Sequence, residues 1–403
     1  PDLVGNSRRQ RRIWKVLALS AFLTAVIVAA WVSLGYLERH VRQGTGEALD
    51  TVVEMVQESV QEWAEGNRRL AEQWAGRPEI IEGCDHLRTL GRDPETLLAD
   101  PTLIRLQALM EDRIRRDGGG DVLIIGRDRT NLFSTREGNV GQINVIGQQR
   151  PERLEAALSG DSVFVPPVRS MPPNVAPEEQ EIEAFSLASI RGTNGEVIGV
   201  LAVGFGANET IRRVLNHGRI GRTGETYAFD RMGMMVSDSR FPESLVQAGL
   251  IGKGGQTSLS IRVLDPGAPL DVGPDSLAPR GEWPLTLMAR RATTGQSGID
   301  VQGYRDYRGI QVFGAWRWVE SLGIGLATEI DASEALSVYS TARMIVVGLS
   351  GLISVLTGLL LYVNEKGSRQ MAQRLRDARD EWERVAEQKS NALHNSEERL
   401  RSF

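Results

Sequence analysis

Two long apolar runs lie near the ends of the sequence. Residues 16–34 contain no charged side chain in 19 positions, and residues 344–363 contain none in 20. At about 1.5 Å of helix rise per residue, each run spans about 30 Å, the thickness of a membrane's hydrocarbon core. Neither run has the polar face of a buried core helix, and no signal-peptide cleavage site follows the first. We expect transmembrane helices over residues 16–35 and 344–363.

Basic residues gather on the outer flanks of both runs. The first run is preceded by a basic segment, residues 1–15, and the second is followed by Lys366, Arg369, Arg374 and Arg376. The inner flanks are poorer in basic residues. The positive-inside rule therefore places both termini in the cytoplasm and residues 37–341 outside. For a bacterium, this predicts a multi-pass protein of the inner membrane with a periplasmic region.

Helical spacing marks the start of the outside region. Residues 38–74 contain no proline, and their apolar positions recur every three or four residues, which predicts one long helix. A second helix is expected over about residues 101–116, because proline stands at its start and a glycine cluster at its end. Residues 37–116 are therefore interpreted as a helical stalk.

The hydrophobic period changes to that of strands in residues 117–207. A short helix is expected over residues 150–160 and a proline-rich loop over residues 166–180. The last two strands meet at Asn194-Gly195, which is a strong hairpin signal. The expected strands cover residues 121–126, 131–135, 163–167, 182–192 and 196–205.

A similar plan follows in residues 208–341, after a linking helix at residues 208–216. A loop with five prolines runs from Pro266 to Pro284, a helix follows at residues 284–293, and a last helix from Ala332 continues directly into the second apolar run. The expected strands cover residues 225–230, 233–239, 298–306, 309–319 and 323–331. A long helix followed by two sheet modules with helices on one side is an α+β fold.

The last segment, residues 364–403, has a heptad-like pattern. Its apolar positions step by four and three residues, and then shift by one position: Met371, Leu375, Ala378, Trp382 and Val385, then Ala386, Leu393 and Leu400. Such a shift is a stutter in a coiled coil, so a signalling helix in a parallel homodimer is expected.

Composition excludes several classes of function. The net charge of -5 gives no support to nucleic-acid binding, which needs a basic face. The single cysteine cannot form an intrachain disulfide, and the four histidines lack metal-ligand spacing. His394 lacks the sequence context of a kinase phosphoacceptor, and no phosphate-binding loop is found. We expect no catalytic residue, metal or cofactor in this chain.

Several stretches of the second module carry a family resemblance. They are "GRTGETYAFD" at residues 221–230, "SDSRF" at 237–241 and "GYRDYRGIQVFGAWRW" at 303–318, followed by "GIGLATEID" at 323–331. With the layout of the chain, they resemble the double Cache extracytoplasmic sensor domains of bacterial receptors. The resemblance implies two PAS-like antiparallel-sheet modules stacked along a long helix. The tyrosine and tryptophan residues of the amino-acid-binding Cache motif have no counterpart in residues 117–207.

Candidate ligand-binding residues follow from this layout. An arginine in a sensor pocket would bind a carboxylate with its guanidinium fork, so a small carboxylate or another anion is the expected ligand. The alternatives are a solvated turn for the arginines at 127 and 129, and aromatic core packing for the tyrosines. The candidates are Arg127, Arg129, Ser134, Arg169 and Ser186 in the first module, and Tyr227, Asp230, Ser237, Arg240 and Tyr304 in the second.

The expected function is transmembrane signalling. A ligand would favour one of two arrangements of the periplasmic region and change the second span and the coiled coil. We expect an output domain beyond Phe403, linked through a PAS domain to a two-component histidine kinase. A chemoreceptor or a nucleotide cyclase with the same sensor is the alternative, and a membrane-anchored hydrolase is a more remote one.

Overall fold

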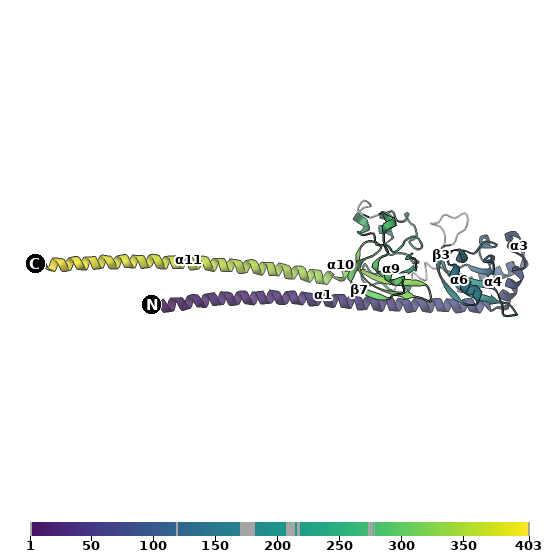
Figure 1. The fold of residues 1–403 in the computed structure, drawn as a ribbon, viewed down its shortest axis with the longest axis horizontal. Helices are drawn as coiled ribbons and strands as arrows, with labels where there is room; N and C mark the ends of the chain where they lie inside the picture. The colour runs from purple at the N-terminus through teal and green to yellow at the C-terminus, as the bar shows by residue number, and fades with distance from the viewer. Residues whose placement is uncertain are drawn as a thin grey trace. The chain divides into compact units, whose positions relative to one another are not determined.

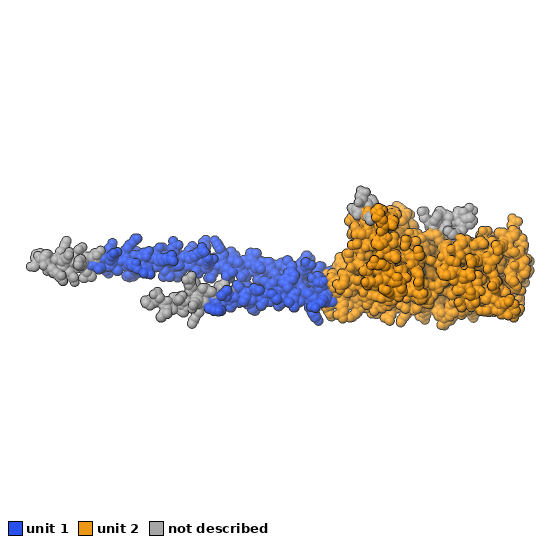
Figure 2. Space-filling view, viewed as in Figure 1, with its two compact units in different colours: residues 1–39, 337–403 blue, residues 40–336 orange. Residues whose placement is uncertain are grey.

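The computed structural model describes residues 2–117, 120–169, 182–206, 214–215, 218–272, 277 and 279–401. The chain forms two compact units, Pro1–Arg39 with Ser337–Phe403, and His40–Leu336 (Figure 2). The expected linking helix at residues 208–216 and residues 170–180 of the expected loop at 166–180 lie largely outside the described residues, whereas residues 166–169 belong to a strand and not to a loop.

The first unit consists of helices alone. It contains the beginning of α1 (Asp2–Ala75) and all of α11 (Ser337–Arg401), and both have a stretch long and apolar enough to cross a membrane. Apolar side chains are exposed along both stretches, for example Phe22 and Leu356. A lipid environment would cover such side chains, so these two stretches are the candidate spans.

The second unit begins with the rest of α1 and contains two sheets. The other helices of this unit are α2 (Pro78–Leu87), α3 (Pro94–Ala99), α4 (Pro101–Asp117), α5 (Val145–Gln149), α6 (Pro151–Ser159), α8 (Pro242–Gln247), α9 (Leu287–Ala292) and α10 (Ala332–Ala335). The strands are β1 (Val122–Gly126), β2 (Asn131–Ser134), β3 (Val163–Arg169), β4 (Ile182–Arg191), β5 (Val197–Gly206), β6 (Glu225–Asp230), β7 (Gly298–Arg305), β8 (Gln311–Val319) and β9 (Ile324–Asp331).

The two sheets confirm the expected α+β plan of two sheet modules. The strand orders are β2-β1-β5-β4-β3 in the first sheet and β6-β9-β8-β7 in the second, and all neighbours are antiparallel. Figure 1 shows the sheet modules following one another along α1. In each sheet, the first strand pairs with the last strand of its module, so the chain closes each module before leaving it.

The two faces of the first sheet have different cores. One face packs against α1, α2 and α4, with Trp74, Ile80 and Leu106 in the same cluster as Val203 of the sheet. The opposite face packs against the short helices α5 and α6 through a separate apolar cluster. Four short helices of this unit, α2, α3, α5 and α8, were not expected from the sequence. They are too short for a periodic signal to distinguish them from loops.

Two local expectations are wrong. Residues 233–239 form isolated bridges and not a continuous strand. Met235 pairs with Phe229 and Val236 N donates to the Ala228 carbonyl, as expected of a hairpin, but Gly233, Met234 and Met235 also pair with residues 259–263. The Asp230 carboxylate accepts hydrogen bonds from the N–H groups of Met232 and Met234, which hold the turn between β6 and these bridges. The last helix is also interrupted, since Leu336 has φ -93° and ψ 10° between α10 and α11.

The turn between β7 and β8 packs closely against the loop that contains Ala268, and this contact can be tested. Gly309 has φ +76°, and a Cβ there would overlap the Ala268 carbonyl group. Gly267 has φ +84°, but a Cβ there would meet nothing within 4 Å. We expect Gly267→Ala to lower the free energy of unfolding by about 1–2 kcal/mol through backbone strain alone. Gly309→Ala should cost about 1–3 kcal/mol more through overlap, measured by denaturant unfolding of both variants. Equal losses would contradict the tight contact.

Candidate functional site

A polar cavity lies in the first module, on the face of the sheet that packs against α5 and α6. Its volume is about 340 Å³, and its apolar lining includes Leu123 of β1, Val168 of β3 and Phe185 of β4. A concave site of this size with a few polar groups is typical of a small-molecule pocket. The polar lining side chains are carboxylates and amides: Asp121, Asn131, Asn139, Gln142, Asn144, Gln148 and Glu183.

Asp121 is a carboxylate held in a fixed position at the cavity wall. It lies directly before β1 and is only 4% exposed. Ser134 Oγ donates a hydrogen bond to it at 3.2 Å, Asn139 Nδ2 donates at 3.0 Å, and the Thr135 hydroxyl also donates. Several donors at one buried carboxylate hold it in position.

Glu183 supplies a second buried carboxylate beside Asp121. Arg136 Nη2 donates to Glu183 Oε1 at 2.7 Å, and Arg136 Nε lies 4.0 Å from Asp121 Oδ2. The Arg136 guanidinium therefore contacts both carboxylates. The carboxylate oxygens of this wall favour a ligand with hydrogen-bond donors.

A chain of amides fixes the loop that covers the cavity. Asn144 Oδ1 accepts a hydrogen bond from Ile146 N at 2.8 Å and so caps α5, while Asn144 Nδ2 donates to Asn131 Oδ1 at 2.6 Å. Asn131 Nδ2 in turn donates to the Asn139 carbonyl at 2.9 Å. Gln142 and Gln148 lie at the exposed edge, and neither amide makes a hydrogen bond within the described residues. These two amides are therefore available to a ligand.

Two predicted arginines of the first module lie in surface contacts outside the cavity lining. Arg127 Nη1, in the β1–β2 turn, donates to the carbonyl of Val197 at the start of β5, at 2.8 Å. Arg129 pairs with Glu155 at 2.5 Å, and both side chains are about half exposed, at 48% and 52%. Both residues belong to the turn that was the alternative interpretation of this segment.

The predicted serines lie at or behind the sheet. Ser134 contacts the cavity indirectly, through its hydrogen bond to Asp121. Ser186 is fully buried and pairs with Val203, which packs in the core on the α1 side of the sheet. Since paired residues of neighbouring strands share a face, Ser186 lies on the face opposite to the cavity.

Arg169 lies at the junction between the two modules. Gln149, the last residue of α5, bonds both backbone groups of Arg169, at 3.0 Å and 2.8 Å. The Arg169 guanidinium donates to Ser260 Oγ at 3.0 Å and to the carbonyls of Ser258 and Leu259 at 3.3 Å. Arg169 therefore connects the helix at the cavity to a loop of the second module.

The predicted tyrosines of the second module meet at a carboxylate that was not predicted. Tyr304 Oη donates to Glu329 Oε1 at 2.6 Å, and Tyr227 Oη donates to Glu329 Oε2 at 3.0 Å. All three side chains are buried. Burial, together with the nearby charge of Asp306, raises the pKa of Glu329 to about 8.

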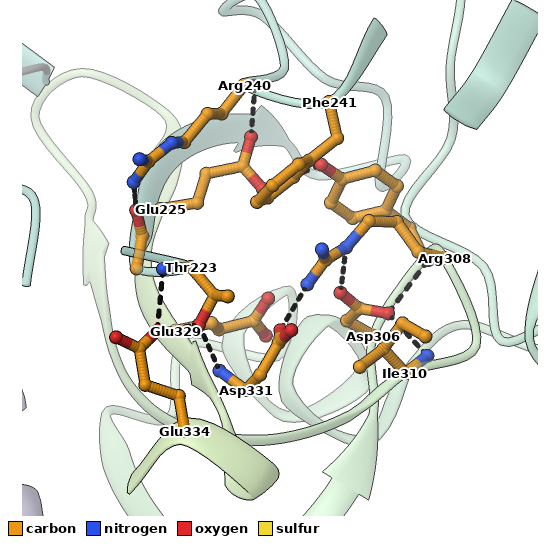
Figure 3. Close-up of polar contacts among 12 residues, drawn as sticks. Thr223, Glu225, Arg240, Phe241, Asp306, Arg308, Ile310, Glu329, Asp331 and Glu334 are labelled. Carbon is orange, nitrogen blue, oxygen red and sulfur yellow. Dashed lines mark hydrogen bonds and ion pairs between the residues drawn. The ribbon is translucent and has the colours of Figure 1, made fainter. Parts of the chain in front are cut away.

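Arg240 lies at a second buried carboxylate, Glu225 (Figure 3). The Arg240 backbone N–H donates to Glu225 Oε1 at 2.6 Å, and Tyr307 Oη donates to Glu225 Oε2 at 2.6 Å. The Arg240 guanidinium donates to the Gly224 carbonyl. Burial raises the pKa of Glu225.

Asp230 and Ser237, the other two predicted residues, stabilise the fold around β6. Asp230 forms an ion pair with Arg150 at 2.8 Å, and it is 7% exposed. Ser237 Oγ accepts a hydrogen bond from Ala228 N at 2.9 Å. Neither residue lies in the lining of the cavity in the first module. The signal that could have identified that cavity is the amide-rich stretch "NVGQINVIGQQ" at residues 139–149.

Comparison with solved structures identifies a class of similar domains. No protein-family profile matches the sequence, and no curated protein matches it. Solved structures that resemble the chain include sensor and ligand-binding domains of histidine kinases and chemoreceptors.

Three of these structures illustrate the range. The sensor domain of the V. cholerae histidine kinase DctB is 12% identical, with a TM-score of 0.42, and the match covers 73% of this chain and 98% of that one. The sensory domain of the Campylobacter jejuni chemoreceptor Tlp3 is 11% identical, with a TM-score of 0.43, and the match covers 75% of this chain and 99% of that one. The ligand-binding domain of the Pseudomonas aeruginosa PAO1 amino acid chemoreceptor PctB, in complex with L-Arg, is 14% identical, with a TM-score of 0.42. The match covers 73% of this chain and 97% of that one.

Glu334 of α10 supplies a pH-dependent test of the second module. Its carboxylate accepts hydrogen bonds from Thr223 Oγ1 and from the N–H groups of Arg222 and Thr223, at 2.5, 2.9 and 2.7 Å. These donors lower the pKa of Glu334 from 4.5 to about 2. Its contribution to stability is therefore present above pH 4.5 and is lost as the pH falls towards 2.

We expect Glu334→Gln to lower the unfolding temperature of the second unit at neutral pH and to have little effect near pH 2. Thermal unfolding of both proteins at several pH values measures this difference. The exposed Glu243→Gln serves as the matched control and should change little at any pH. A difference that persists unchanged at low pH would contradict the role of the charge.

Proposed function

We propose that this chain is the sensory part of a transmembrane signal receptor, and that a small molecule binds in the cavity of the first module. The observation that carries the proposal is this cavity of about 340 Å³, with the fixed carboxylates of Asp121 and Glu183 in its wall. It lies in a unit whose first helix, α1, also contains a candidate membrane span. A ligand site and a helix that enters the membrane are the two parts that a receptor needs.

The chemistry of the wall favours a ligand that donates hydrogen bonds. Asp121 and Glu183 accept, the free amides of Gln142 and Gln148 accept or donate, and Phe185 offers an aromatic surface. A small amine or a polyol satisfies these groups. A carboxylate or another anion, the ligand expected from the sequence, would have to compete with Glu183 for Arg136.

The rest of the signalling scheme is proposed from the sequence. Residues 37–341 lie in the periplasm, and both termini lie in the cytoplasm of a bacterial inner-membrane protein. Ligand binding favours one arrangement of a homodimer, and α11 carries the change through its span into a coiled coil. The proposed output is a two-component histidine kinase, and a chemoreceptor or a nucleotide cyclase is the alternative.

A thermal-shift screen of the full chain in detergent tests the ligand proposal. The screen uses four compounds of different chemistry: putrescine as an amine, L-lysine as a zwitterion, ribitol as a polyol and succinate as a carboxylate. A true ligand at 100 times its dissociation constant stabilises the folded state by about 2.7 kcal/mol. We expect an amine or the polyol to raise the unfolding temperature and succinate to leave it unchanged. Stabilisation by succinate alone would support an anion site instead.

Asp121→Asn tests whether the stabilising compound binds in the cavity. The variant keeps the shape of the side chain but removes a buried charge. It should therefore weaken the binding of an amine by about 1.5–3 kcal/mol, or about 10- to 100-fold in the dissociation constant. Asp161→Asn, in the exposed loop between α6 and β3, is the matched control. Equal affinities of the two variants, measured by calorimetry, would place the ligand elsewhere.

A further inference from the structure

Two buried carboxylates stand directly opposite each other in the second sheet. Glu225 of β6 and Glu329 of β9 are register partners, and they are only 4% and 3% exposed. Like charges at directly opposed positions repel, and a buried ionised carboxylate without a cation is costly. The geometry therefore disfavours simultaneous ionisation of this pair.

Glu329 is enclosed by two phenols, from β6 and β7. Tyr227 and Tyr304 both reach its carboxyl oxygens, and Gly314 of β8, the next register partner, leaves room for them. A Cβ at Gly314 would overlap the Tyr304 hydroxyl. A phenol both donates and accepts, so this enclosure satisfies a neutral carboxylic acid as well as a carboxylate.

The charged groups around Glu329 are already engaged with other partners. Asp306, in the β7–β8 turn, is fully buried and pairs with Arg308 at 2.6 Å, and Arg308 also pairs with Asp331 at 2.7 Å (Figure 3). Glu225 takes its hydrogen bonds from Tyr307 and the Arg240 backbone. Within the described residues, no arginine or lysine forms a hydrogen bond with Glu329.

The protonation of Glu329 follows from these surroundings. Burial and the charges of Asp306 and Glu225 raise its pKa to about 8, although the hydrogen bonds from Tyr304 and Tyr227 act in the opposite direction. Burial also raises the pKa values of Tyr227 and Tyr304 well above 10, so the phenols stay neutral when Glu329 ionises. Glu329 is thus the group of this enclosure that titrates nearest to neutral pH.

The position of Glu329 connects its charge to the end of the sheet. Two residues further on, Asp331 ends β9 and the chain enters α10. Ionisation of Glu329 adds a negative charge beside Asp306, whose partner Arg308 also holds Asp331. Ionisation of Glu329 therefore changes the electrostatic environment of Arg308, and Arg308 holds Asp331 at the entry to α10.

We propose that the second module contains a proton-binding site, formed by Glu329 between Tyr227 and Tyr304, through which the receptor responds to alkalinity independently of the cavity in the first module. The ligand of this site is the proton itself, so it needs no cavity. Its response is separate from the small-molecule binding proposed above, and either can fail without the other.

Infrared difference spectroscopy of the full chain in lipid nanodiscs tests the proposal. The carbonyl stretch of a protonated carboxylic acid should disappear as the pH rises, with a midpoint at about 8. Glu329→Gln should abolish this transition, while Glu243→Gln and Asp121→Asn should keep its midpoint. A wild-type chain without such a transition, or the same transition in Glu329→Gln, would overturn the proposal.

Two further variants keep the test decisive if Glu329→Gln does not fold. Glu225→Gln removes the opposed charge and should lower the midpoint, because ionisation of Glu329 becomes easier. Tyr304→Phe removes a donor to the ionised form and should raise the midpoint. Midpoints that do not move in these opposite directions would assign the transition to another group.

The pH dependence of stability gives an independent measurement with a defined sign. Between pH 4.5 and about 8 the folded chain keeps the Glu329 proton and the unfolded chain has lost it. The contribution of Glu329 to the free energy of unfolding therefore falls as the pH rises through this range. Glu329→Gln should become more stable relative to wild type over the same range, and a constant difference would contradict the proposal.

Discussion

The second unit depends on one buried stripe of α1, because a single helix closes one face of both sheets. Leu49, Val53 and Val56 pack in a cluster that includes residues of the second sheet, and further along the helix Trp74 packs under the first. Trp63 lies between these regions and contacts Phe164 and Phe205 edge to face. Each buried side chain of this kind contributes about 1.5–3 kcal/mol, so neither sheet is independent of the helix.

The two modules differ in how the opposite face of each sheet is filled. In the second module Tyr227, Tyr304, Tyr307 and Trp316 occupy this face, and all are buried. Residues 117–207 contain no tyrosine or tryptophan, and short helices cover the equivalent face of the first sheet. Large aromatic side chains fill the second module, whereas their absence from the first is consistent with its cavity of about 340 Å³. The same plan therefore leaves a polar cavity at this face of the first sheet and fills the equivalent face of the second sheet with aromatic side chains.

Periodicity predicted the elements well where a long pattern was available. The stalk, the candidate spans and nine strands follow from apolar spacing, whereas residues 233–239 form only isolated bridges because their backbone groups are shared between β6 and residues 259–263. The site was harder to predict. Arginines were expected at the ligand, but the cavity wall consists of Asp121, Glu183 and the amides, which tertiary packing brings together from separate segments. Tyr227 and Tyr304 were predicted to bind a ligand; the structure places both at Glu329, which looks like an ordinary strand residue in the sequence.

The contacts between the modules connect the two proposed sites. The α5 helix lines the cavity with Gln148, and the following residue, Gln149, holds the backbone of Arg169, which reaches the second module. Arg150 then pairs with Asp230, the last residue of β6, the strand that begins with Glu225. A shift of α5 on ligand binding and a charge change at Glu329 would therefore act on the same β6–β9 pair. Because β9 leads directly into α10, two unrelated stimuli need only this one pair of strands to influence the helix that follows.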